Sequence, residues 1–108
     1  MKTYKVYWTE EAVTDLSEII DYIAEDRPSA ANKMYKNIKT KCRELNQFPH
    51  RCRRVPELIS LGMQNYREVI HSVYRIVFKI DGNNICITAV VDGRRDFESF
   101  IFDRLLRE

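Results

Sequence analysis

Residues 72–91 read SVYRIVFKIDGNNICITAVV and carry the clearest structural signal in the chain. Valine, isoleucine and aromatic side chains dominate residues 72–80 and 85–91, which favours two β-strands. The intervening Asp-Gly-Asn-Asn, residues 81–84, is typical of a hairpin turn because Gly and Asn tolerate a positive φ. Residues 66–71, YREVIH, predict another strand just before this hairpin. Together the three strands are expected to form an antiparallel meander.

Two amphipathic helices are predicted on the N-terminal side of the meander, after a short β-rich run at residues 3–8. Thr9 suits a helix N-cap, and apolar residues then recur every three or four positions through residues 10–25. Pro28 fits the first turn of a second helix, which we expect to end at Pro49. The short break between the two helices predicts an antiparallel helix hairpin.

The C-terminal segment predicts one more helix, which begins near Asp96. Its apolar positions serve either the core of the domain or an interface with a partner. These positions are Phe97, Phe100, Ile101 and Leu105. The resulting order, β-α-α-β-β-β-α, describes a single α+β domain over residues 1–108, with the helix hairpin on one face of the sheet.

Alternation along the strands separates two faces of the sheet. One face is apolar throughout and is expected to meet the helix hairpin. Its predicted members are Tyr74, Ile76, Phe78 and Ile80 on one strand and Ile85, Ile87, Ala89 and Val91 on the next. The opposite face is mixed in composition, so we expect it to be half open to solvent.

Four arginines are candidate site residues. Arg75 lies in mid-strand on the mixed face, where arginine is unusual, and we expect Arg67 to share that face from the preceding strand. Arg94 and Arg95 follow the end of the last strand, where loops often carry function. Guanidinium groups suit forked contacts to phosphate or carboxylate. The alternative is that these arginines form structural ion pairs with neighbouring carboxylates. The carboxylates nearest in sequence are Glu68, Asp92 and Asp96.

Charge and composition exclude several classes of protein. Among 108 residues, 18 Lys and Arg against 16 Asp and Glu leave a net charge of +2, too small by itself to indicate a nucleic-acid binder. The three Cys and two His match no zinc spacing, so neither a metal nor a cofactor is expected. Because no stretch approaches the ~20 apolar residues of a membrane span, and the N-terminus lacks an apolar signal core, we expect a cytoplasmic protein.

Several short runs together resemble the RelE/ParE toxin superfamily. They are WTEEA at 8–12, PSAA at 28–31, YREV at 66–69, YRIVF at 74–78 and VVDGRRD at 90–96. The resemblance spans nearly the whole chain to about Phe97, and the order of the runs is closest to the ParE branch, often called plasmid stabilisation proteins. It implies a type II toxin held inactive by an antitoxin from the same operon.

The resemblance implies one of two activities. The RelE branch cleaves messenger RNA in the ribosomal A site, whereas the ParE branch poisons DNA gyrase. In the nuclease case, Arg75 matches an arginine that contacts the scissile phosphate region, and Arg95 matches one that stabilises developing negative charge. Glu57 or His71 is then the candidate base.

The chain departs from the nuclease pattern at the positions that transfer protons. The nuclease branch uses a C-terminal Tyr or a His–Tyr pair, but here no Tyr follows Tyr74 and no His follows His71. Asp92 stands where many relatives have His. A weak net charge also suits a protein-directed toxin better than a ribosome binder. We therefore predict a gyrase-directed toxin without chemistry of its own. The alternatives are a ribosome-dependent endoribonuclease and a degenerate member that only binds antitoxin.

The predicted partners are a cognate antitoxin of the ribbon-helix-helix type and DNA gyrase, with the ribosome and mRNA as the alternative target. An acidic antitoxin tail is expected to wrap the sheet or the helix hairpin and to fold as it binds. Arg67, Arg75, Arg94 and Arg95 are the candidate residues for binding the target or the antitoxin. The expected assembly is a homodimer or a toxin–antitoxin hetero-oligomer.

Overall fold

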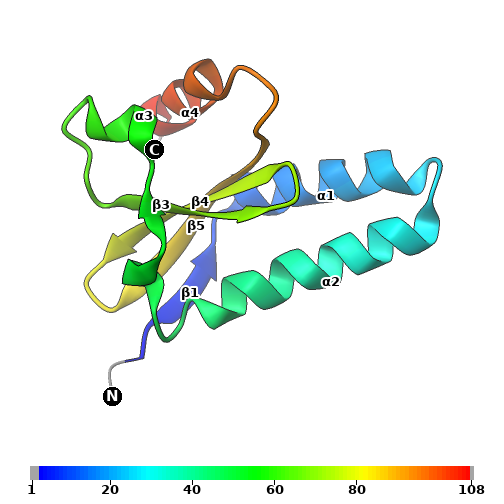
Figure 1. The fold of residues 1–108 in the computed structure, drawn as a ribbon, viewed down its shortest axis with the longest axis horizontal. Helices are drawn as coiled ribbons and strands as arrows, with labels where there is room; N and C mark the ends of the chain where they lie inside the picture. Colours follow the sequence, from blue (N-terminus) through cyan, green and yellow to red (C-terminus); the bar gives the residue numbers. More distant parts are fainter. Residues whose placement is uncertain (1–2, 108) are drawn as a thin grey trace.

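The computed structural model describes residues 3–107 and has the predicted α+β architecture (Figure 1). Its elements are β1 (Lys5–Trp8), α1 (Glu10–Ala24), α2 (Pro28–Glu44), a 3-10 turn η1 (Pro49–Arg51), β2 (Arg53–Arg54), α3 (Pro56–Ile59), β3 (Tyr66–His71), β4 (Tyr74–Asp81), β5 (Asn84–Asp92) and α4 (Phe97–Leu106). Among residues 3–107, no helix combines the length and the apolar character that a membrane span requires.

Within residues 3–107, the sheet has five strands in the order β1-β5-β4-β3-β2. The predicted meander is confirmed, because β3, β4 and β5 pair antiparallel, and β1 adds to β5 in parallel. Asp81 pairs with Asn84 across a turn in which Gly82 has φ +60°, the conformation that glycine tolerates best. Two-residue β2 extends the sheet at its other edge.

The local helix signals are largely confirmed. The side chain of Thr9 accepts a hydrogen bond from the backbone N–H of Ala12 at 3.1 Å and so caps α1. Pro28 occupies the first turn of α2. The predicted end of α2 is wrong, because this helix stops at Glu44 and Pro49 instead opens the turn η1.

A β-bulge overturns the predicted faces of β5. Val77 of β4 pairs with Ala89, but the next residue, Phe78, pairs with Ile87, so Thr88 is an extra residue in β5. Beyond this bulge the alternation of β5 is reversed. Ala89 and Val91 therefore pack on the same side as Val77, and Val90 packs on the side of the helix hairpin.

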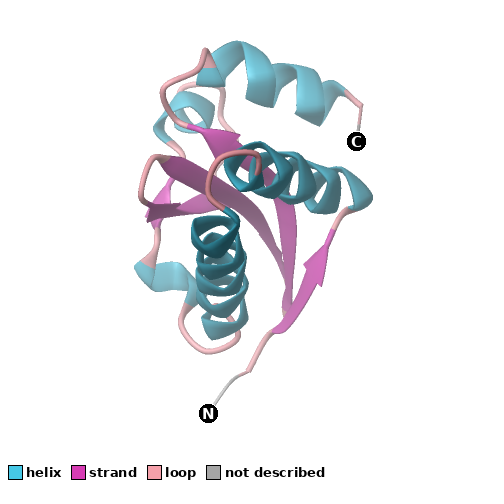
Figure 2. Cartoon of the chain, turned by 90° about the vertical axis from the view of Figure 1, so that its right-hand side faces the viewer, coloured by secondary structure: helices cyan, strands magenta, loops and turns pink. Residues whose placement is uncertain are grey.

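The sheet separates two apolar cores (Figure 2). The first lies under the helix hairpin and includes Leu16, Ile38 and Phe78. The second lies under α3 and α4, which sit together at one end of the molecule, and includes Leu58 and Ile101. These two helices cover only part of the second face, where Val77 and Ala89 are buried. Ile70 and Tyr7, which the register places on the same face, are 45% and 51% exposed, so this face is half open as expected. Of the alternatives for α4, the core role is confirmed for Phe97 and Ile101, which are buried.

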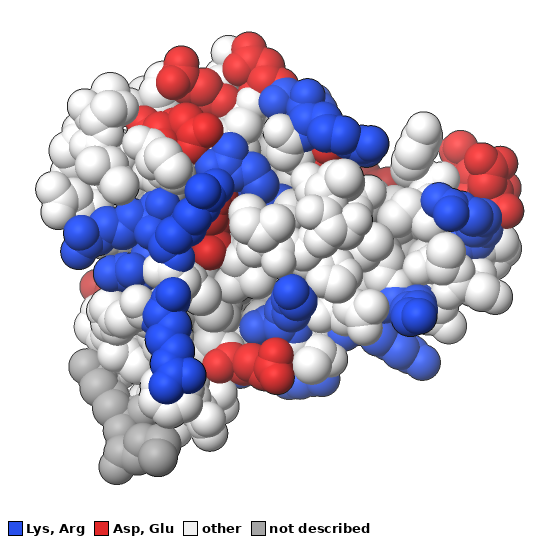
Figure 3. Space-filling view, in the orientation of Figure 1, with Lys and Arg blue, Asp and Glu red and all other residues white. Residues whose placement is uncertain are grey.

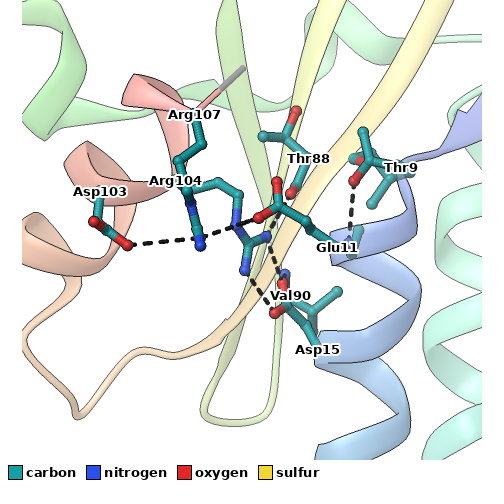
Figure 4. Close-up of polar contacts among 10 residues, drawn as sticks. Thr9, Glu11, Asp15, Thr88, Val90, Asp103, Arg104 and Arg107 are labelled. Carbon is teal, nitrogen blue, oxygen red and sulfur yellow. Dashed lines mark hydrogen bonds and ion pairs between the residues drawn. The ribbon is translucent and has the colours of Figure 1, made fainter.

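A buried ion pair fastens α4 to the rest of the domain (Figure 4). Arg104 donates two hydrogen bonds to the carboxylate of Asp15 in α1, at 2.8 and 2.9 Å, and a third to the carbonyl of Thr88 at 2.8 Å. Asp15 also accepts from the backbone N–H of Val90 at 3.0 Å. In the described chain, β1 pairs with β5 only as far as Ile87. The two charged side chains thus satisfy backbone groups of β5 that no longer face a strand.

Candidate functional site

Arg75 is held between two carboxylates on the face of the sheet that α4 covers. Its Nη1 and Nη2 atoms donate to the two oxygens of Glu57, at 3.0 and 2.8 Å. Its Nε and Nη2 atoms donate to the two oxygens of Glu68, at 2.7 and 3.0 Å. Four of the five N–H donors of this guanidinium are therefore used inside the protein.

Strand register and one short helix create this arrangement. Because Ile70 pairs with Arg75 and Glu68 with Val77, Glu68 lies on the same face as Arg75, one diagonal step away. Glu57 comes from the first turn of α3, where Pro56 starts the helix. The side chain of Glu68 is 0% exposed and receives a further hydrogen bond from Nε of Arg53 at 2.7 Å.

The remaining sides of Arg75 are also covered. The Cζ atom of its guanidinium lies 3.5 Å from the ring centroid of Phe97, the first residue of α4. Gly93 packs against its stem so closely that a Cβ there would lie 3.1 Å from Cδ of Arg75. The side chain is only 12% exposed. Of the alternatives from the sequence, the structure shows the ion pair for Arg75, with Glu68, seven residues away, and Glu57, eighteen residues away.

The ion pairs set the protonation of the cluster. The hydrogen bond from Arg75 is the main cause that holds the pKa of Glu57 below its usual value. Burial opposes the charge of Arg75, but the hydrogen bonds to Glu57 and Glu68 outweigh it and raise the pKa of Arg75. Glu57 is therefore a weaker proton acceptor than an ordinary glutamate.

Two other predicted residues lie on the opposite face of the sheet. Arg67 pairs with Phe78 and therefore lies on the face opposite to Arg75. The prediction that these two arginines share a face is wrong. Its Nη1 atom donates to the carbonyl of Cys52 at 2.6 Å and to that of His50 at 3.2 Å. His71 pairs with Tyr74, also on the side of the helix hairpin, where burial and then Lys41 lower its pKa.

Arg94 and Arg95 lie exposed in the loop after β5. Arg94 forms a forked ion pair with Asp92, at 3.0 and 2.8 Å, and this lowers the pKa of Asp92 to about 2. Arg95 lies with its Cζ atom 5.7 Å from the ring centroid of Phe100. Both arginines border a hollow of about 350 Å³ that Tyr22 also lines. The four arginines therefore do not form one platform.

Sequence reasoning did not identify Arg53, Asp15 or Arg104 as members of polar clusters. The available signal for a buried carboxylate was the position of Glu68 in β3, where it shares a face with the apolar residues Tyr66 and Ile70. No comparable local pattern marks Arg104, because its partner Asp15 lies at the other end of the chain.

Glu57→Gln is expected to destabilise the protein most near neutral pH. The depressed pKa of Glu57 means that its ionised form contributes stability above its unfolded value of 4.5, and that this contribution disappears as the pH falls further. We expect a loss of about 1–2 kcal/mol at pH 7, at the low end for a hydrogen bond between charged groups because the Glu57 side chain is 28% exposed, and this loss shrinks toward zero below about pH 4. Urea denaturation across this pH range measures it.

The control for that experiment is Glu98→Gln, at an exposed position in the first turn of α4. Its effect is expected to stay within about 0.5 kcal/mol at every pH. A Glu57→Gln loss that is equally large at pH 3 and pH 7 contradicts the ion-pair origin of the effect.

Comparisons with known proteins agree with this fold. The family described as ParE toxin of type II toxin-antitoxin system, parDE, matches residues 6–97. Toxin RelE2 of Caulobacter vibrioides is 41% identical over 49 residues, a match covering 45% of this chain and 56%, about half, of that protein.

Two solved structures are similar in fold. The chromosomal ParDE TA system from P. aeruginosa aligns with a TM-score of 0.68 and 20% identity, covering 83% of this chain and 96% of the other. The toxin-antitoxin complex RelBE2 from Mycobacterium tuberculosis aligns with a TM-score of 0.60 and 17% identity, covering 83% of this chain and 98% of the other. Because the family match covers most of the chain, the protein belongs to the ParE toxin family of type II toxin–antitoxin systems.

Proposed function

We propose that this protein inhibits DNA gyrase and that a cognate antitoxin neutralises it. The observation that carries the proposal is that the guanidinium of Arg75 is already bound within the protein. Arg75 is the position that matches the strand arginine of the nuclease branch. An arginine that contacts a scissile phosphate must present free N–H donors to it. Here Glu57 and Glu68 take four of the five donors, and Phe97 covers the guanidinium.

The groups around Arg75 also argue against RNA cleavage. Attack by a 2′-hydroxyl needs a proton acceptor and a proton donor close to the phosphate. Glu57 has a lowered pKa, and His71 lies on the other face of the sheet. The aromatic residues of α4 are Phe97, Phe100 and Phe102, which transfer no protons. These features favour a toxin that acts by binding a protein.

The groove between the two long helices is the proposed surface for the antitoxin. A hollow of about 260 Å³ lies there, bordered by Trp8, Val13 and Tyr35, of which the latter two are exposed. Nζ of Lys39 lies 4.7 Å from the centroid of the Trp8 ring, at the margin of the hollow. Apolar walls with a cationic margin suit an amphipathic, acidic segment that folds as it binds. A ribbon-helix-helix antitoxin with such a tail is our specific expectation, with both proteins in the cytoplasm.

A supercoiling assay with purified gyrase tests the proposed target. We expect the toxin to reduce supercoiling in a dose-dependent manner and the cognate antitoxin to restore it. Unchanged supercoiling at a large molar excess of toxin contradicts the proposal. Heat-unfolded toxin at the same concentration is the control for non-specific inhibition.

The partial likeness to RelE2 makes mRNA cleavage the second candidate. Primer extension on translated messages tests it in cells that express the toxin alone. New cleavage ends that vanish in Arg75→Ala support the nuclease and overturn the gyrase proposal. Healthy growth without antitoxin, in cells that contain folded toxin, indicates the degenerate member.

A further inference from the structure

Three arginines come from neighbouring segments at the β2 edge of the sheet, namely η1, β2 and β3. We call Arg51, Arg54 and Arg67 the arginine edge. Arg54 of β2 and Arg67 of β3 stand directly opposite each other in the antiparallel register. The Nη1 atom of Arg67 donates to the carbonyls of His50 and Cys52, which flank Arg51 in the chain. Arg51 and Arg54 are exposed, and Arg67 is half-buried.

In the described part of the chain, no carboxylate forms an ion pair with the arginine edge. The nearby carboxylates of Glu57 and Glu68 are held by Arg75 and Arg53, so this inner cluster is neutral in sum. Figure 3 shows Lys and Arg side chains gathered over this part of the molecule.

The arginine edge lowers the stability of the protein when no ligand is bound to it. Like charges directly opposite each other on neighbouring strands destabilise a sheet, and Arg54 faces Arg67 in this way. The net charge of the whole chain is only +2, so three uncompensated arginines on one edge represent a local concentration of charge. A polyanion that binds there removes the repulsion and offers oxygens in the geometry that guanidinium groups prefer.

We propose that the arginine edge binds the phosphodiester backbone of duplex DNA, namely the segment that gyrase holds. That this DNA is the segment held by gyrase rests on the proposed function. Backbone binding needs a line of cations rather than an apolar groove, and it is independent of sequence. An acidic peptide also needs apolar anchors, which the groove at Trp8 and Tyr35 provides and which the arginine edge provides only at Phe48, where Arg51 covers the ring at 4.2 Å.

Binding of the arginine edge to duplex DNA is tested by fluorescence anisotropy of the full-length toxin with a labelled 30-base-pair duplex. Three backbone contacts predict that log K falls with log[salt] with a slope of about −3. Arg51→Ser/Arg54→Ser is expected to reduce the slope by about two and to weaken binding about tenfold at low salt. Arg67 is left in place, because its hydrogen bonds tie β3 to the preceding segment.

The matched control is Lys33→Ser/Lys36→Ser, which removes the same charge from exposed positions on α2. This control is expected to bind duplex DNA as the unaltered toxin does. Equal weakening by both double variants shows an effect of net charge alone and overturns the proposal, as does unchanged binding by Arg51→Ser/Arg54→Ser. Tighter binding of single-stranded RNA than of duplex DNA also overturns it. Circular dichroism melts of both variants verify that they fold.

A second experiment distinguishes the proposed DNA site from the proposed inhibition of gyrase. In the supercoiling assay, Arg51→Ser/Arg54→Ser is expected to need about tenfold more toxin for half-inhibition, in line with its loss of backbone contacts, while its affinity for the antitoxin is unchanged. Loss of antitoxin binding with normal DNA binding identifies an acidic-peptide surface and overturns the proposal. If the unaltered toxin binds duplex DNA through these arginines but leaves gyrase active, the gyrase assignment fails and the DNA site stands.

Discussion

Replacing Arg104 with Met is expected to lower the free energy of unfolding by about 3–5 kcal/mol, the usual cost of leaving a buried charge without its partner. The carboxylate of Asp15 is 11% exposed and would lose both hydrogen bonds from the guanidinium. The carbonyl of Thr88 would lose its donor as well. Urea denaturation followed by circular dichroism measures this loss, and the second core under α4 is expected to loosen first.

Arg107→Met is the control for Arg104→Met on the same helix. Arg107 also pairs with acidic residues, Glu11 and Asp103, but its side chain is 55% exposed. Exposed pairs contribute little, so we expect a loss below about 1 kcal/mol. Similar small losses in both variants would show that water reaches Asp15 and that the pair does not fasten α4.

Replacing Arg75 with Met is expected to cost about 2–4 kcal/mol of stability, because the buried Glu68 loses one of the two arginines that pair with it in residues 3–107 and keeps Arg53. The same variant is expected to keep its inhibition of gyrase per folded molecule, since Arg75 faces carboxylates of its own chain. A nuclease that uses Arg75 at the phosphate would instead lose its activity. Denaturation and the supercoiling assay, each corrected for the folded fraction, provide the two measurements.

Arg53→Met provides the matched control for Arg75→Met. Arg53 contacts the same carboxylate of Glu68, but its side chain is 57% exposed, so we expect a loss of about 1 kcal/mol. An Arg75→Met protein that is as stable as the unaltered chain but no longer toxic contradicts the structural role that we assign to Arg75.

Much of the secondary structure follows from short-range signals. The hairpin turn at Gly82, the cap at Thr9 and the Pro28 helix start all appear where their local chemistry predicts them. The segment between α2 and β3 could not be assigned from such signals, because β2 has two residues and α3 has four. Elements this short are stabilised by their neighbours rather than by their own propensity.

The candidate site was predicted only in part. Arg75 was identified as an unusual residue in mid-strand and Glu68 as a possible ion-pair partner, but the second partner, Glu57, and the burial of Arg75 were not. Its face was expected to be half open, and the reversal of β5 at Thr88, which brings Ala89 and Val91 to that face, was invisible in the alternation. Without that bulge, Ala89 and Val91 would not have contributed to a second core under α4.

Local sequence thus places the strands, the turn and the helix starts of this protein, because hydrogen bonds and backbone preferences within a few residues are enough to define them. The chain also contains eleven arginines, whose contacts cannot be read from the local sequence. The fold assigns their roles by bringing distant residues into contact. Arg75 forms ion pairs with Glu57 and Glu68. Arg104 donates a hydrogen bond to the carbonyl of Thr88, where β1 no longer pairs with β5. Arg54 lies opposite Arg67 in the pairing of β2 with β3. The energy of an ion pair depends on separation and burial in space, and neither quantity is encoded in the spacing of residues along the chain.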